Sequence, residues 1–347
     1  ANLVSATSGT ERERGFVGTF PALSGNVIYM IKKQNLRRKM ERKEKKSKKK
    51  QIVKLLGIVL SLVILGFMVY QFVQNWNDIQ PYLANTNWII LIIAIILYAI
   101  AFLSTGYNWA YVLWNLDPRL TKREYLNIHM ISALARYIPG GIWNIVGKAY
   151  MCTEKGVEKS ATTASMILEY VFQIVSSGLF FIFFLPVLMK EVLNLWLTIA
   201  FIAGILVVLL LLPWGVRVGT KILGKIFKED LAEIYLTNRY VYSVLLRYMA
   251  VWIFTGFGLI VLVKAFSDIK FMQGIYLILS YPISWVVGFL SPSPNGMGIR
   301  EGVLSLLLGS SYSYELVLLI TLTTRIWTML GEAVAFVGYQ IYYHIGR

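Results

Sequence analysis

Two short segments of the chain interrupt long apolar stretches with proline, glycine and charged residues. The residues concerned are Arg136, Pro139, Gly140, Gly141, Asn144 and Lys148 in the first segment, and Asn295, Gly296, Gly298, Arg300 and Glu301 in the second. Proline removes a backbone donor and glycine favours release of the helix, so both breaks leave backbone polar groups unpaired. Inside a bilayer, such backbone is tolerated only where protein buries it or where it lines a wet cavity. We therefore expect both breaks to face a polar interior.

The apolar segments that follow the two breaks also carry charge. Glu169 follows the first break, and Arg325 and Glu332 follow the second. A charged side chain at the bilayer centre costs roughly 2.5 to 3.5 kcal/mol on insertion scales, so these groups must pair or meet a charged substrate. A guanidinium fork suits phosphate and keeps its charge. Arg136 and Arg300, with Arg325 as a third candidate, are therefore predicted contacts for a phosphate-bearing head group.

Two interpretations of these charges stay open on sequence alone. In the first, the arginines and the helix N-termini after each break bind an anion, and a glutamate balances a cationic group or carries a coupling proton. In the second, Arg136 pairs with Glu169 inside the protein. Arg300 then pairs with Glu332 or Glu301, and neither pair contacts substrate.

The composition excludes a water-soluble fold. The 347 residues are 57% hydrophobic and 15% charged, with a mean hydropathy of +0.61, whereas soluble domains carry about 25% charged residues. One cysteine and two histidines give no disulfide within the chain and no metal-site spacing. Hydrolase, zinc-protease and P-loop motifs are absent from the sequence, so we expect no catalytic residue, no metal and no cofactor.

Other polar and aromatic residues receive structural interpretations. His129 lies on an apolar arm and is expected to be a hydrogen-bonded packing residue rather than a proton relay. Many tryptophans, Trp109 among them, fall near predicted span ends, where an interfacial aromatic belt is expected.

Most of the net charge of +16 lies in one segment. The run from Lys32 to Lys50 holds twelve Lys and Arg against two glutamates, a net of +10. It has no aromatic residues and ends where an apolar span begins, so we expect membrane-surface anchoring rather than nucleic-acid binding. Residues 1–50 are thus predicted to be a basic, disordered cytoplasmic tail.

The apolar runs predict six membrane spans, at about 52–73, 88–114, 161–185, 195–212, 241–262 and 314–343. Basic loops alternate with loops poor in Lys and Arg, which places both termini in the cytoplasm. The stretch 124–152 has basic residues at both ends. Its two arms, of about fourteen and eleven residues at roughly 1.5 Å per residue, are too short to cross a 30 Å core. It is predicted to be a re-entrant hairpin from the cytoplasm, and 271–308 a second one from outside.

The order of spans and hairpins is the same in the two halves, but their polarity is opposite. Matching Gly/Pro-interrupted segments in two halves indicate an inverted repeat with a substrate site near the membrane midplane. We therefore predict an all-α polytopic membrane protein with six spans and two oppositely oriented re-entrant hairpins. Its membrane domain covers 51–347, with one repeat at 51–192 and the other at 193–347.

The two breaks also resemble the paired signatures of a known family. The first reads Ala135-Arg136-Tyr137-Ile138-Pro139-Gly140-Gly141-Ile142-Trp143, and the second has a P-x-P-x-G-x-G-x-R-E core within 291–302. Both resemble the lysylphosphatidylglycerol synthase transmembrane region, a flippase-like family typified by the membrane half of the multiple peptide resistance factor. The likeness covers about 54–343. It implies movement of lipids with charged head groups between leaflets of a bacterial or archaeal cell membrane, a role that carries over to Arg300 and Glu301.

Relatives in that family often carry a cytoplasmic aminoacyl-lipid synthase domain. This chain stops at Arg347, and its N-terminal portion is too short for one. We therefore expect no synthase activity, which places an aminoacylated phospholipid substrate in doubt.

The expected function is nucleotide-independent translocation of an anionic or zwitterionic phospholipid or a polyprenyl-linked lipid, so the partners are membrane lipids. One alternative is a non-catalytic membrane protein that presents lipid to a separate transferase. Another is a small-solute or ion symporter.

Overall fold

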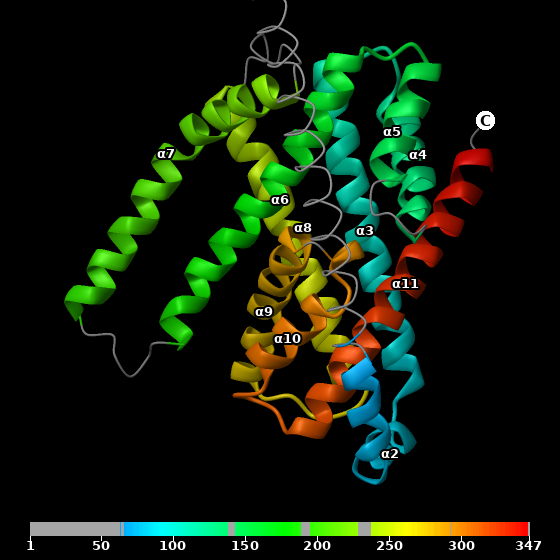
Figure 1. Ribbon diagram of the computed structural model, residues 1–347, viewed down its shortest axis with the longest axis vertical. Coiled ribbons are helices and arrows are strands. Elements are labelled where there is room, and N and C mark those ends of the chain that lie inside the picture. Colours follow the sequence, from blue (N-terminus) through cyan, green and yellow to red (C-terminus); the bar gives the residue numbers. More distant parts are fainter. Residues whose placement is uncertain are drawn as a thin grey trace, which may run out of the picture. The chain divides into compact units, whose positions relative to one another are not determined.

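A computed structural model describes residues 63, 66–137, 143–188, 195–227, 237–291 and 293–345. The predicted tail at 1–50 and residues Pro139, Gly140 and Gly141 lie outside these ranges. The described residues form helices without strands, which confirms the all-α prediction for this part of the chain (Figure 1). The helices are α2 (Trp76–Ala84), α3 (Trp88–Leu116), α4 (Lys122–Leu134), α5 (Trp143–Glu154), α6 (Lys159–Leu188), α7 (Leu195–Phe227), α8 (Asn238–Lys264), α9 (Phe271–Leu290), α10 (Ile299–Leu308) and α11 (Tyr314–Ile345), with 3₁₀ turns η1 (Ala135–Tyr137) and η2 (Pro294–Gly296).

Six of the described helices are long and apolar enough to cross a membrane, namely α3, α6, α7, α8, α9 and α11. This set differs from the predicted six. The predicted span at 52–73 lies mostly outside the described residues, whereas α9 was predicted as one arm of a hairpin. The 20 residues of α9 span about 30 Å at 1.5 Å per residue, so its length alone suffices for crossing.

Side-chain caps fix where several helices begin. Thr121 and Glu124 form a capping box at the start of α4, in which the Glu124 backbone N–H donates to Thr121 Oγ1 at 3.3 Å. The Thr121 N–H in turn donates to Glu124 Oε2 at 3.0 Å. Asn87 Oδ1 accepts from the Ile89 N–H at 3.1 Å at the start of α3. Such caps satisfy backbone donors that have no partner within the helix.

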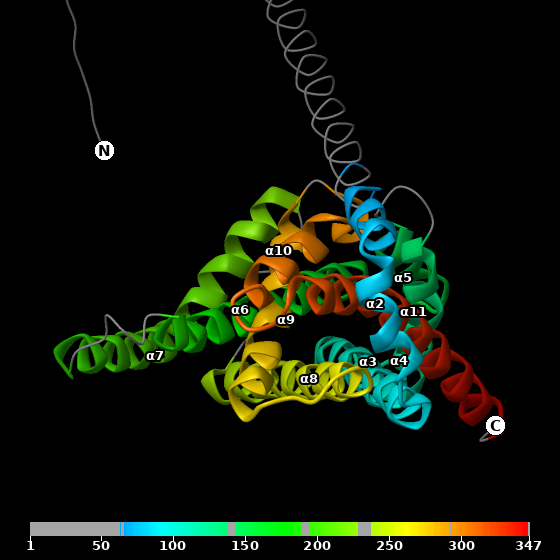
Figure 2. The ribbon, with the colours of Figure 1, turned by 90° about the horizontal axis from the view of Figure 1, so that it is seen from below.

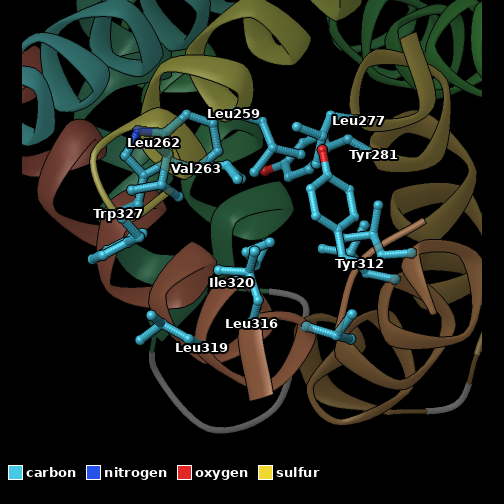
Figure 3. Packing of buried hydrophobic residues seen from close by; sticks show 14 of the residues in the cluster. Leu259, Leu262, Val263, Leu277, Tyr281, Tyr312, Leu316, Leu319, Ile320 and Trp327 are labelled. Atoms are coloured by element: carbon cyan, nitrogen blue, oxygen red, sulfur yellow. The ribbon is translucent and has the colours of Figure 1, made fainter. Parts of the chain in front are cut away.

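The central helix α3 packs against both α8 and α11 (Figure 2). The largest buried cluster joins α8, α9 and α11, and Figure 3 shows Leu259, Leu277, Leu319 and Trp327 among its members. The Trp327 Nε1–H donates to the Ala94 carbonyl of α3 at 2.7 Å, so the buried indole also satisfies its polar atom. These contacts hold the three long helices α3, α8 and α11 in register.

The segment α4–η1–α5 returns to the end from which it starts. Glu124 near the start of α4 lies 3.8 Å from the ammonium of Lys155, which follows α5. Asp117, which precedes α4, accepts a hydrogen bond from the Glu158 N–H beyond α5 at 2.9 Å. Because α4 also packs against α5, the two helices form an antiparallel pair.

The segment α9–η2–α10 folds back in the same way. Gln273 near the start of α9 donates from Nε2 to the Ser311 carbonyl beyond α10 at 2.8 Å. The Tyr312 hydroxyl donates to the Gln273 carbonyl at 3.1 Å. The start of α9 and the end of α10 therefore lie side by side.

The two folded-back segments meet opposite ends of α11 (Figure 1). Arg123 at the start of α4 donates to the carbonyls of Tyr342 and Tyr343, at 2.9 and 2.8 Å, near the C-terminal end of α11. In contrast, α10 leads through 309–313 directly into the N-terminal end of α11.

The close approach of α8 and α9 requires a glycine. A Cβ at Gly256 would lie 2.8 Å from Ile278 Cα, whereas a Cβ at Gly338 of α11 has nothing within 4 Å. We predict that Gly256→Ala lowers the free energy of unfolding by about 1–3 kcal/mol, because overpacking forces backbone shifts. Gly338→Ala should leave the free energy of unfolding unchanged or raise it. Unfolding in mixed micelles measures both, and equal effects would contradict this packing.

Candidate functional site

One face of α11 binds charged side chains from both breaks. Glu332 Oε1 accepts a hydrogen bond from Arg136 Nη1 of η1 at 2.9 Å. Arg325 Nε donates to Glu301 Oε1 of α10. Arg325 and Glu332 are seven residues apart, so they share a helix face and are separated by about 10 Å along the axis. The two breaks are therefore brought together by a single helix.

This pairing lies near the middle of α11. Eleven residues separate Tyr314 from Arg325, and thirteen separate Glu332 from Ile345. At 1.5 Å per residue the pairs are roughly 17 and 20 Å from the two ends of the helix. Both breaks thus reach the central part of the bundle.

The second break is built from left-handed backbone. Asn295, Gly296 and Gly298 have φ angles of 52°, 66° and 79°. Glycine adopts this region at no steric cost, and Asn tolerates it better than most residues. A Cβ at Gly296 would also lie only 3.0 Å from Gly288 Cα of α9. The glycine spacing of this motif is thus explained by the turn that sends the chain from α9 into α10.

Glu301 joins this turn to α11. Its side chain is 1% exposed, and its Oε2 accepts a hydrogen bond from the Gly298 N–H at 2.7 Å while Oε1 binds Arg325. Arg325 Nη2 donates in addition to the Asn295 carbonyl at 3.3 Å. The carboxylate therefore caps α10 and neutralises a guanidinium at once.

Arg300 has a different environment. Its guanidinium carbon lies 4.5 Å from the centre of the Tyr281 ring, and Nη2 donates to the Tyr281 hydroxyl. Tyr281 packs edge-on against Trp327, which in turn contacts the Tyr98 ring at 4.7 Å between centroids. In the described part of the chain, no carboxylate lies within ion-pair distance of Arg300.

The first break contributes Arg136 and Asn144. Arg136 lies over the Phe102 ring of α3, 5.2 Å from its centre, in addition to its pairing with Glu332. Asn144 Nδ2 donates to the Tyr170 hydroxyl of α6 at 3.3 Å.

A buried ion pair joins α5 to α6. Lys148 Nζ lies 2.6 Å from Glu169 Oε2, and both side chains are about 5% exposed or less. The ammonium also lies 4.4 Å from the centre of the Trp109 ring. His129 Nδ1 is 3.8 Å from Glu169 Oε1, and neither ring nitrogen of His129 has a hydrogen-bond partner among the described residues. The predicted hydrogen bond of His129 is therefore wrong for this part of the structure, although its burial is confirmed.

The ion pairs differ from those of the second interpretation that the sequence left open. Arg136 pairs with Glu332 rather than Glu169, because the end of α4 packs against α11. Glu169 is bound instead by Lys148, because α5 packs against α6. Arg300 pairs with neither Glu332 nor Glu301, since Glu301 is bound to Arg325.

Together these groups form what we call the charged site, which comprises Arg136, Lys148, Arg300, Arg325, Glu169, Glu301 and Glu332. It contains four basic side chains and three carboxylates. Each carboxylate pairs with one of the other basic side chains, so Arg300 has no carboxylate partner among these residues. No three His, Cys, Asp or Glu side chains of the described residues come together as a metal site would need.

Aromatic rings hold several of these cations and were not predicted to do so. Trp109, assigned to an interfacial belt, is 0% exposed and contacts Lys148 in the interior. Phe102 and Tyr281 have the same role for Arg136 and Arg300. An aromatic ring can stabilise a desolvated cation by about 2 kcal/mol.

The pair Lys148–Glu169 generates a stability prediction. Glu169→Gln leaves the Lys148 ammonium buried without its carboxylate and should lower the free energy of unfolding by about 3–5 kcal/mol. Lys155, which forms an exposed ion pair with Glu124, serves as a control. Lys155→Gln should change the free energy of unfolding by at most about 1 kcal/mol. The double variant Lys148→Met/Glu169→Leu should recover most of the loss. Unfolding in mixed micelles measures all three, and a loss for Glu169→Gln no larger than the control contradicts the buried pair.

No curated protein matches the chain. The family model of the lysylphosphatidylglycerol synthase TM region matches residues 54–334, a range that contains α2 to α10, most of α11, and every residue of the charged site. The match covers most of the chain, and it includes both breaks and the helix that binds them. The chain therefore belongs to the lysylphosphatidylglycerol synthase TM region family.

Proposed function

We propose that this integral, multi-pass membrane protein translocates a charged-head-group lipid between the leaflets of a bacterial or archaeal cell membrane and is not an enzyme. The substrate is an anionic or zwitterionic phospholipid or a polyprenyl-linked lipid. Membership of a lipid-related family supports this function. The lipid class rests on the chemistry of the charged site.

The proposal includes the membrane topology. The segments α4–η1–α5 and α9–η2–α10 are re-entrant hairpins that enter from opposite sides, and the two halves of the chain form an inverted repeat. Support comes from the hydrogen bonds of Arg123 in α4 to the C-terminal end of α11, and from the short connection through which α10 leads into the N-terminal end of α11. The basic loops that flank α4 and α5 orient this hairpin, and with it both termini, toward the cytoplasm.

The observation that carries the proposal is the convergence of both breaks on the middle of α11. Arg325 and Glu332 bind one break each, about 10 Å apart on one helix face. Broken helices that meet near the midplane are typical of substrate sites in transporters built from inverted repeats. A polar head group that crosses the bilayer needs hydrated or charged groups at this depth.

The charge balance supports an anionic group on the substrate. Three of the four cations of the charged site are bound to carboxylates, whereas Arg300 is held by the ring and hydroxyl of Tyr281. A phosphate that binds Arg300 forms charge-assisted hydrogen bonds without breaking an ion pair. Arg300 is therefore the first phosphate contact, and Arg136 and Arg325 exchange their glutamates for phosphate as the head group moves. The acyl chains stay in the bilayer throughout.

The buried group of His129, Lys148 and Glu169 favours a second candidate, a proton-coupled symporter. His129 and Lys148 each lie within 4 Å of the Glu169 carboxylate, and all three side chains are almost fully buried. A proton relay in a membrane protein has this composition. The non-catalytic lipid-presenting partner is the third function that an experiment must separate.

A translocation assay tests the proposal. The purified full chain is placed in liposomes with fluorescent phosphatidylglycerol in both leaflets, and a membrane-impermeant quencher is added outside. We expect loss of the inner-leaflet signal to accelerate over empty liposomes. Arg300→Gln should slow it about tenfold or more, because a charge-assisted hydrogen bond to phosphate contributes about 1.5–3 kcal/mol.

The matched control is Lys264→Gln, an exposed cation at the end of α8, which should translocate at the normal rate. A folded Arg300→Gln variant that translocates as fast as the unaltered protein overturns the assigned role of Arg300. Wild-type rates equal to empty liposomes for several head groups favour the lipid-presenting partner, and solute uptake driven by a proton gradient favours the symporter.

A further inference from the structure

A second site lies on the opposite side of α3 from the charged site. It is a groove of about 510 Å³ between α3, α8 and the C-terminal part of α11. None of the residues that line it belongs to the charged site. A molecule bound there would therefore be distinct from the substrate of the charged site.

Apolar and aromatic side chains form most of the groove. Tyr107 of α3, Phe254 of α8 and Tyr342 of α11 line it and are 41%, 50% and 62% exposed. All three belong to helices that are long and apolar enough to cross a membrane. A groove open on the outer surface of such helices faces lipid chains, and its walls suit an acyl chain.

A basic side chain lies in this mostly apolar groove. Arg247 follows Asn238 by nine residues, so it is about 14 Å along α8 from the start of that helix. Its guanidinium carbon is 4.4 Å from the centre of the Tyr111 ring, and no carboxylate of the described residues pairs with it. Lys122 lies over the same ring, 5.2 Å from its centre. Lys122 is closer still to the Trp114 ring, at 4.2 Å, so two cations near this end of the groove favour an anion there.

A buried amide in the groove also lacks a partner. Asn108 lines the groove, is 4% exposed, and its Nδ2 has no hydrogen-bond partner among the described residues. A buried donor without an acceptor costs about 1–3 kcal/mol, so native structures rarely keep one. Protein atoms cover this Nδ2, so a ligand in the groove meets the charge of Arg247 rather than this donor.

From these observations we propose that the groove holds a resident phospholipid with an anionic head group. Its phosphate binds Arg247, and an acyl chain lies against Phe254. Lys122 adds long-range attraction for the anionic head. This lipid is a bound component of the protein, separate from the substrate that moves through the charged site.

Lipid retention by the purified full chain tests the site. Protein in mild detergent is titrated with phosphatidylglycerol, with phosphatidylcholine and with glycerol 3-phosphate, and native mass spectrometry counts the bound molecules. We expect phosphatidylglycerol to bind more tightly than phosphatidylcholine. Glycerol 3-phosphate should not bind measurably, because it leaves the apolar walls unoccupied.

Two variants address the two parts of the ligand. Arg247→Gln should weaken phosphatidylglycerol binding about tenfold and remove the preference over phosphatidylcholine. Ala250→Phe fills the groove from α8 and should remove one bound molecule of either lipid while Arg247 stays in place. A folded protein that elutes as the unaltered chain does and lacks this molecule supports the site, even where the arginine variant does not fold.

Two controls separate this proposal from the proposed function. Arg239→Gln removes an exposed cation from the same end of α8 and should bind phosphatidylglycerol normally. Arg300→Gln, in the charged site, should also keep the groove lipid, whether or not the chain translocates lipid. Equal binding by the unaltered protein, Arg247→Gln and Ala250→Phe would overturn the proposal, as would tight binding of glycerol 3-phosphate alone.

Discussion

The ion pairs on one face of α11 are the interaction on which the rest of the arrangement depends. Unpaired, each of these charges costs roughly 2.5–3.5 kcal/mol at the centre of a membrane helix. Removing one partner of a buried pair leaves that cost uncompensated, so without a substrate anion Arg136 stays paired with Glu332 and Glu301 with Arg325. These pairs hold two irregular segments, from distant parts of the sequence, against the same helix.

The same pairs determine which cation is available to a ligand. Arg136, Lys148 and Arg325 each contact a carboxylate, and phosphate must displace it to bind them. Arg300 is held by a tyrosine ring and hydroxyl, contacts that contribute about 2 kcal/mol or less for the ring. A phosphate can replace these neutral contacts with a stronger charge-assisted bond. In the proposed function, the difference between ring and carboxylate partners, more than the number of arginines, gives the charged site its selectivity for an anion at one position.

The sequence predicted the residues of the charged site better than their contacts. The helical class, the breaks near Arg136 and Arg300, and the charges on the following helices were recognisable because Pro, Gly and charged residues are rare in apolar segments. The pairing was not recognisable from sequence. Glu169 and Glu332 are both candidates for Arg136, and only helix packing decides between them. The prediction that Trp109 belongs to an interfacial belt was wrong for a related reason. Position along a span indicates depth in the membrane, whereas the side of the helix that a ring faces depends on its neighbours.

The two sites of the molecule are separated by α3, and its two faces differ accordingly. Phe102 and Trp109, seven residues apart, face the cations Arg136 and Lys148. Tyr107 and Asn108 line the groove on the opposite side. At 100° per residue, the groove residues of α3 centre roughly 160° from Phe102, so one helix forms the wall of both sites. An effect of a lipid in the proposed groove on the charged site can pass through α11, which lines both, or through α3, whose position is fixed by α8, by α11 and by the hydrogen bond from Trp327 to Ala94. Since Trp327 also contacts the ring that holds Arg300, a shift of α3 would change the environment of the one cation without a carboxylate partner in the described charged site.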